Sequence, residues 1–162
     1  MTATGSVTIG SMTTGSMTTA ALVLFTLWCA VLAAVDLRVR RLPNALTGAG
    51  ALAVFGYALA TGRPWPAVVG ALLLASPYLA VHLAAPAACG AGDAKLAVAV
   101  GAAAGLGGAQ AWVTAALGAP VLTAAAGSMM LARARSCPTG RTTVPHGPAM
   151  CVATLFALAV TT

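Results

Sequence analysis

The stretch CGAGDAKL, residues 89–96, carries an acidic residue into an otherwise apolar part of the chain. It places Asp93 after two glycines, Gly90 and Gly92, and two residues before Lys95, at the start of an apolar run. Only two of the 162 residues are acidic, and the other is Asp36. A carboxylate kept at the mouth of an apolar segment needs a physical reason.

The composition around this stretch is that of a membrane protein. Hydrophobic residues make up 60% of the chain and charged residues 6%, whereas a soluble domain has about 25% charged residues. A membrane-spanning helix takes about 20 apolar residues, so the chain has room for five or six spans and no second domain. We therefore expect an all-α, polytopic protein of the cytoplasmic membrane, with the lipid bilayer as a partner.

Six apolar segments follow one another, at residues 20–35, 45–61, 66–84, 93–108, 110–131 and 148–162. The fourth and sixth are short, so hydropathy alone leaves five spans open. Residues 1–19 are rich in Thr, Ser, Gly and Met and contain the near-repeat GSMTTGSMTT. We expect them to form a disordered tail in front of a membrane domain at 20–162.

The basic residues favour six spans. Six spans place seven of the eight on one side of the membrane (Arg38, Arg40, Arg41, Lys95, Arg133, Arg135 and Arg141) and leave Arg63 on the other. By the positive-inside rule the first side is cytosolic, so both termini lie on the non-cytosolic side. The net charge of +6 follows no single stripe and aromatic residues are scarce, so a nucleic-acid partner is not expected.

This topology brings the two acids to the same side of the membrane. Asp36 closes the first span and Asp93 opens the fourth, and an ionisable residue at such a boundary is by default a functional candidate. Two carboxylates within a few Å share one proton, so one acts as a base and the other as an acid. The pair predicts aspartic-protease chemistry on a peptide carbonyl. Gly90 and Gly92 would allow unusual backbone angles, a close substrate strand and water beside Asp93.

Three motifs in this sequence resemble those of one known protein family. GAGDAKL, residues 90–96, resembles the G-x-G-D motif with its trailing lysine of the type IV prepilin peptidases, intramembrane aspartic proteases that include the archaeal preflagellin peptidases. DLRVRRLPN, residues 36–44, resembles the family's first catalytic segment, in which a basic pair and a Pro-Asn follow the Asp. VPHGPAM, residues 144–150, is similar to the Pro-x-Gly-Pro that leads into the family's last helix.

The resemblance implies a six-helix endopeptidase that removes the short basic leader from pilin-like precursors at the cytosolic face. Asp36 and Asp93 would be the catalytic pair, and Gly90 and Gly92 the motif glycines. The supporting motif positions would be Arg41, Pro43, Asn44, Lys95, Pro145, Gly147 and Pro148.

The cysteines set this chain apart from the larger members, which carry paired C-x-x-C motifs and methylate the cleaved pilin. Cys29, Cys89, Cys137 and Cys151 form no such pair, so we expect no metal, no cofactor and no methyltransferase activity. The chain resembles the short, protease-only form found with Flp/Tad-type pilus systems. Disulfides are not expected either, because Cys89 and Cys137 would face the reducing cytosol.

Simpler interpretations of single residues stay open. Asp93 could only cap the fourth helix, and Asp36 could pair weakly with the arginines that follow it. Lys95 could act on Asp93 or extend to the interface, which we take as its default. His82 and His146 are more typical of packed or solvated residues than of catalytic ones.

Other classes of function also stay open. Two acids facing a wet cavity could relay protons or bind a cation, although the sequence shows no inverted repeat and neither acid lies at mid-span. An inactive homologue could serve in pilus or secretion assembly, although both acids are intact. The presenilin group also has G-x-G-D, but there a tyrosine precedes the first Asp, and here Val35 does.

Overall fold

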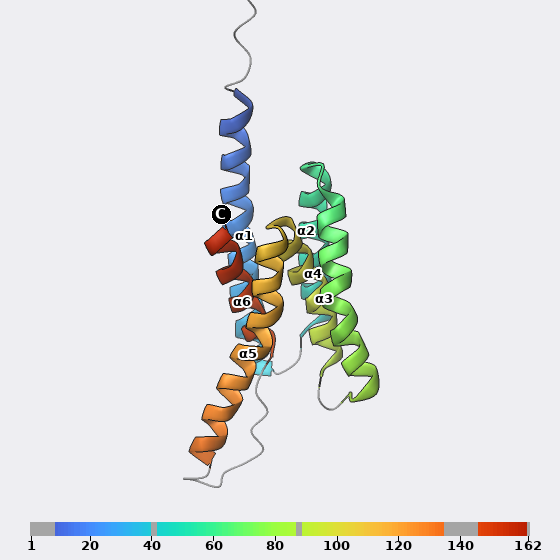
Figure 1. Cartoon of the computed structure of the whole chain (residues 1–162), viewed down its shortest axis with the longest axis vertical. Helices are drawn as coiled ribbons and strands as arrows, with labels where there is room; N and C mark the ends of the chain where they lie inside the picture. Colours follow the sequence, from blue (N-terminus) through green and yellow to red (C-terminus); the bar gives the residue numbers. More distant parts are fainter. Residues whose placement is uncertain (1–8, 40–41, 87–88, 135–145, 162) are drawn as a thin grey trace, which may run out of the picture.

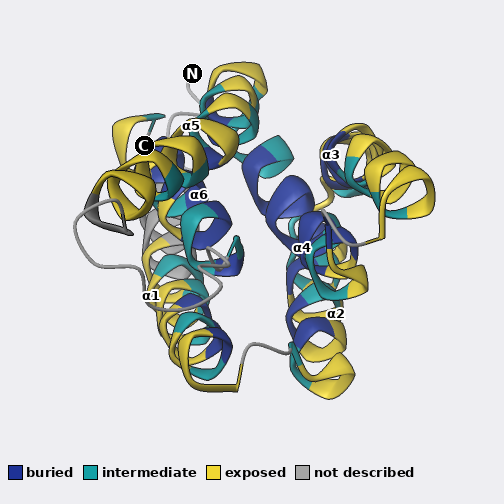
Figure 2. Ribbon diagram, turned by 90° about the horizontal axis from the view of Figure 1, so that it is seen from below, coloured by how far each residue is buried: buried dark blue, intermediate teal, exposed yellow. Residues whose placement is uncertain are grey.

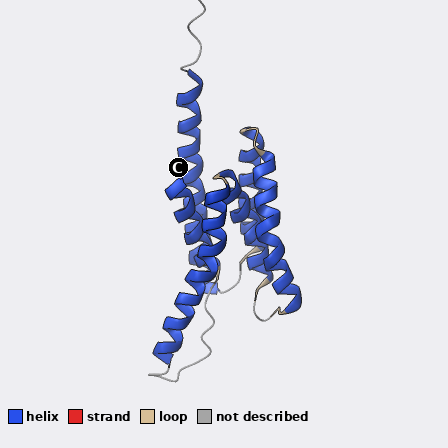
Figure 3. Ribbon diagram, in the orientation of Figure 1, coloured by secondary structure: helices blue, strands red, loops and turns tan. Residues whose placement is uncertain are grey.

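The computed structural model describes residues 9–39, 42–86, 89–134 and 146–161. These residues form helices and short loops without a strand (Figures 1 and 3). The helices are α1 (Ile9–Val39), α2 (Asn44–Ala60), α3 (Pro64–Ala84), α4 (Ala91–Leu106), α5 (Ala109–Ala134) and α6 (Gly147–Thr161). The predicted all-α class is confirmed, and each predicted apolar segment coincides with one helix.

Three of the helices are long and apolar enough to cross a membrane. Their candidate spans are Thr19–Val39, Pro64–Ala84 and Ala109–Ala132. The apolar helices α2 and α6 are shorter, and α4 has 16 residues. The structure therefore agrees with a membrane protein, while the count of six spans stays a prediction.

Helix α1 begins earlier than the predicted span. It starts at Ile9, inside the segment 1–19 that the sequence suggests is a tail, whereas its apolar part starts at Thr19. The division into tail and membrane domain stays a prediction. Several residues singled out from the sequence lie outside the described ranges, namely Arg40, Arg41, Arg135, Cys137, Arg141 and Pro145.

The helices form two groups of three. Helices α2, α3 and α4 pack on one another, and α6 packs against both α1 and α5. Figure 2 shows the two groups side by side. Contacts of α4 with α5 and α6, and of α1 with α2, join them. The Trp112 side chain of α5 also donates a hydrogen bond to the Gly70 carbonyl of α3, at 3.0 Å.

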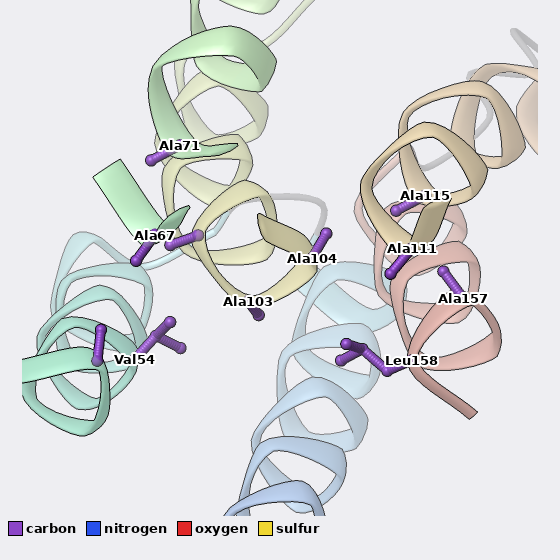
Figure 4. Packing of buried hydrophobic residues seen from close by; sticks show 11 residues of the cluster. Val54, Ala67, Ala71, Ala103, Ala104, Ala111, Ala115, Ala157 and Leu158 are labelled. Carbon is purple, nitrogen blue, oxygen red and sulfur yellow. The ribbon is translucent and has the colours of Figure 1, made fainter. Parts of the chain in front are cut away.

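Small residues allow this packing. Nine of the 16 residues of α4 are buried, and all but Leu96 and Val100 are alanine or glycine. A Cβ added at Gly101 would lie 2.8 Å from the Leu74 Cβ and 3.2 Å from the Ala71 Cα of α3. Figure 4 shows alanines from several helices meeting in one cluster. The helix backbones therefore approach closely, as small residues permit in membrane proteins.

One end of the bundle gathers the segments that carry the motifs. The ends of α1, α3 and α5 and the starts of α2, α4 and α6 lie there (Figure 1). Of the described basic residues, Arg38, Lys95 and Arg133 belong to these segments. Arg63 precedes α3, in the turn at the opposite end. The four positions follow the distribution expected from the sequence.

Candidate active site

Asp36 lies one turn before the end of α1 and is buried, with 6% of its surface exposed. The N-terminus of α6 lies against it. The backbone N–H of Gly147, the first residue of α6, donates a hydrogen bond to the carboxylate. A Cβ at Gly147 would lie 2.8 Å from Asp36 Oδ2. A helix N-terminus favours negative charge, so the glycine gives this buried carboxylate a close donor that a larger residue would block.

Asp93 occupies the third position of α4 and is half-buried. Its Oδ2 accepts a hydrogen bond from the Gly90 N–H, at 3.3 Å. Asp93 thus caps the helix, as the simpler interpretation proposes, and capping leaves its other oxygen available for chemistry. Gly147 and Gly90 therefore play parallel parts, since each presents one backbone N–H to one of the two acids.

The motif glycines differ from the expectation. Gly90 has φ −71° and ψ 148°, an extended conformation that any residue adopts. Among the described glycines, only Gly62 and Gly108 have positive φ. The predicted unusual backbone angle at Gly90 is wrong, because an N-cap position needs only the β region.

Gly92 is needed for a close approach, but to a side chain of this chain. A Cβ at Gly92 would lie 3.0 Å from the Cβ of Leu42. One at Gly147 would lie 3.6 Å from the Leu42 Cδ1. Leu42 therefore packs beside both glycines, where water was expected next to Asp93. Leu42 belongs to the motif DLRVRRLPN, but the sequence gives no signal for this contact, because the contact depends on how the helices pack.

The structure brings the two acids together from different helix groups. Asp36 on α1 and Asp93 on α4 lie close enough to interact electrostatically. Both also act on His146, the residue that precedes α6. The expectation that the acids lie near each other therefore agrees with this geometry.

His146 is the residue that the sequence undervalues. Its Nε2 lies 2.8 Å from the Tyr78 hydroxyl and its Nδ1 lies 2.6 Å from the Thr123 hydroxyl. Burial lowers the pKa of His146 below its ordinary value, while the nearby Asp93 and Asp36 oppose that shift. A signal was present, because His146 is the variable position of the Pro-x-Gly-Pro match. Its neighbours could not be deduced from one sequence.

The remaining motif residues shape the ends of helices. Pro43 precedes α2 and its carbonyl accepts the Leu46 N–H, at 3.0 Å. Lys95 is exposed and its Nζ donates to the Asn44 Oδ1, at 2.8 Å. Pro148 is the second residue of α6, where the missing N–H costs no intrahelical bond.

Cys89 and the apolar cavity between the helices add little to the chemistry of this end. Burial and the nearby Asp93 raise the pKa of the Cys89 thiol, so it stays protonated near neutral pH. Among the described residues, no group of three or more His, Cys, Asp or Glu side chains could hold a metal ion. An apolar cavity of about 500 Å³ lies between α1, α2, α4 and α6, and none of its lining residues belongs to this site.

Comparison with known proteins gives one match. The sequence model of the type IV leader peptidase family matches residues 23–132, which is more than half of the chain and includes both acids. No curated protein and no solved structure match the chain.

Proposed function

Because this chain belongs to the type IV leader peptidase family, we propose that it is a membrane aspartic endopeptidase with Asp36 and Asp93 as its catalytic pair. Its substrates are precursors of type IV pilin-like proteins, of the Flp/Tad or a related class. It removes their leader peptide at the cytosolic face of the membrane. No cofactor takes part in the proposal.

One observation supports this proposal above the others. The chain has two acidic residues, and they lie within electrostatic reach of each other although 57 positions of sequence, counted from 36 to 93, separate them. Each has a backbone N–H as a donor. A carboxylate pair arranged this way suits general acid–base chemistry on water.

The proposed mechanism uses the shared proton of the pair. The ionised carboxylate takes a proton from water as the water oxygen attacks the scissile carbonyl carbon. The protonated carboxyl donates a hydrogen bond to the carbonyl oxygen and stabilises the tetrahedral intermediate. Collapse of the intermediate breaks the C–N bond, and the leaving amine takes up a proton from the pair.

The topology belongs to the same proposal. Six spans with both termini on the non-cytosolic side place the acids at the cytosolic face, where a precursor presents its basic leader before its hydrophobic helix. We assign supporting roles at that face to Asn44, Lys95, Gly147 and Pro148, and to the motif positions Arg41 and Pro145. Residues 20–162 would form the peptidase domain and residues 1–19 its tail.

The test is a cleavage assay by co-expression with a tagged pilin-like precursor from the same genome. The enzyme is the wild type, Asp36→Asn or Asp93→Asn, and the product is read by mobility shift and N-terminal sequencing. Either substitution removes a member of the pair and keeps its shape, so we expect cleavage before the hydrophobic segment by the wild type alone. Gly56→Ala is the control, because a Cβ there meets no atom within 4 Å.

Two results would count against the proposal. Full activity of either Asn variant would exclude the carboxylate pair. If the wild type inserts normally but cuts no candidate precursor, the protease proposal loses its main support. Proton or cation movement through the bundle would then be measured next, and after it a role in pilus or secretion assembly without catalysis.

A further inference from the structure

His146 connects three helices at the end of the bundle that carries the acids. Its ring nitrogens contact Tyr78 of α3 and Thr123 of α5. Its carbonyl accepts the Met150 N–H in the first turn of α6, at 3.2 Å. The Tyr78 contact crosses from one helix group to the other, and the two rings lie tilted against each other, with an interplanar angle of 43° and centroids 5.4 Å apart.

The hydrogen bonds assign the direction of every proton in this chain of groups. The Thr123 hydroxyl donates to the Ala119 carbonyl, at 2.9 Å, so its oxygen accepts from the His146 Nδ1–H. A neutral imidazole has one N–H, which leaves Nε2 as the acceptor of the Tyr78 O–H. The network is complete with His146 neutral, whereas protonation of Nε2 would reverse its bond with Tyr78 and leave the Tyr78 O–H without the acceptor it has here.

The titratable groups that act on this imidazole come from three helices. They are Asp36 of α1, Asp93 of α4 and the Tyr78 hydroxyl of α3. Helix α5 contributes the uncharged hydroxyl of Thr123. The two acids favour an imidazolium and burial opposes it, and the Tyr78 O–H loses its acceptor if Nε2 binds a proton. Whether the proton of the site resides on the imidazole or on the carboxylates therefore depends on Tyr78.

We propose that His146 is a positioning residue of this site: bonded by Tyr78 and Thr123 in its neutral form, it joins the two helix groups and leaves the shared proton on the carboxylates. This inference rests on the proposed peptidase function. It adds a third element to the pair, supplied by the loop before α6. A carboxylate pair needs one proton to act as acid and base together, and a free imidazole beside it would compete for that proton.

The first test is the pH dependence of cleavage by Tyr78→Phe. Without the hydroxyl, Nε2 is free to bind a proton, so the pKa of His146 rises and an imidazolium forms nearer neutral pH. A cation beside the carboxylates makes the pair lose its shared proton at lower pH. We expect the basic limb of the rate profile to move to lower pH by about one unit. A role of Tyr78 in packing alone would lower the rate and leave the limb in place.

The matched control is the same substitution in a His146→Gln background. Glutamine keeps an acceptor for Tyr78 but cannot titrate between pH 5 and 9. His146→Gln should therefore cut at a reduced rate, and adding Tyr78→Phe should leave its basic limb unmoved. An equal shift with and without His146 would overturn the inference, as would no shift in the Tyr78→Phe protein.

A second measurement needs no substrate. The chain has two histidines, so His82→Gln with ¹⁵N-histidine labelling gives the nitrogen signals of His146 alone. At neutral pH we expect a neutral ring protonated at Nδ1, and a larger charged fraction after Tyr78→Phe. In the protein that keeps Tyr78, a charged His146 ring or an Nε2–H tautomer would overturn the inference even if cleavage is established. A failure of wild-type cleavage with the expected ring signals would instead count against the peptidase function.

Discussion

At the scale of single residues, Gly147 gives the sharpest test of how Asp36 is held. A Cβ at this position would lie 2.8 Å from Asp36 Oδ2 and 3.4 Å from its Cγ, so Gly147→Ala must displace the carboxylate or the start of α6. Because a misplacement of about 1 Å costs about a hundredfold in rate, we expect a loss of that order. The cleavage assay measures it, on protein whose insertion and amount are checked.

The control for Gly147→Ala is Gly56→Ala, where a Cβ meets no atom within 4 Å. Gly56 lies in the C-terminal half of α2, beyond the end that carries the motifs, and an alanine there should leave cleavage at the wild-type rate. A wild-type rate for Gly147→Ala would contradict the close contact between α6 and Asp36.

The sequence predicts the acids better than it predicts their partners. The positions of Asp36 and Asp93 relative to the apolar segments suffice to bring them to one end of a bundle. Gly147 and His146 become neighbours of the acids, and Leu42 becomes a neighbour of Gly92 and Gly147, only through the packing of the helices on one another. Tertiary contacts of this kind leave no periodicity in the chain, so one sequence contains no signal for them.

At the scale of helices, the crossing of α3 and α4 depends on glycine. A Cβ at Gly101 would lie 2.8 Å from the Leu74 Cβ and 3.2 Å from the Ala71 Cα. The second atom belongs to the backbone, so the helices must separate. We expect Gly101→Ala to lower the free energy of unfolding by about 1–3 kcal/mol, as for other overpacked sites. Thermal unfolding in detergent measures the change, and Gly56→Ala, with open space around its Cβ, is the reference.

An unfolding temperature for Gly101→Ala equal to that of the reference would show that α3 and α4 do not cross through this glycine. A lowered temperature with cleavage intact after correction for the folded fraction would place its role in packing alone. Gly101 lies more than two turns into α4 from Asp93, so we expect that second pattern.

Helix positions are more predictable than helix lengths. The six apolar segments coincide with α1 to α6, because Gly, Pro and charged residues separate the apolar runs. The start of α1 at Ile9 lies outside the prediction, since Thr, Ser and Gly are poor helix formers and give no start signal. The start of α4 at Ala91 also precedes the predicted residue 93, because Gly90 supplies the N-cap and Asp93 the third position.

At the scale of the whole molecule, the site belongs to both helix groups and to neither alone. Asp36 and the loop before α6 come from one group, and Asp93 and Tyr78 come from the other. The short helix α4 is the most enclosed, with nine of its 16 residues buried. A helix covered by its neighbours meets little lipid, so it need not match the full thickness of the hydrocarbon core.

Because enclosed short helices can still cross the membrane, the number of crossings is a prediction that can be tested directly. Helices α2, α4 and α6 have 17, 16 and 15 residues, or roughly 22–26 Å at 1.5 Å per residue, against about 30 Å of hydrocarbon. Alternation of the helix ends (Figure 1) and the basic residues near the acids both favour six crossings.

We therefore expect alkaline phosphatase, which is active only outside the cytosol, to be active when fused after Thr162 or after Gly62. Fusions after Asn44 or Pro86 should be inactive. An inactive fusion after Thr162 with an active one after Gly62 would mean five crossings, and an active fusion after Pro86 would place Asp93 on the wrong side of the membrane for a cytosolic leader.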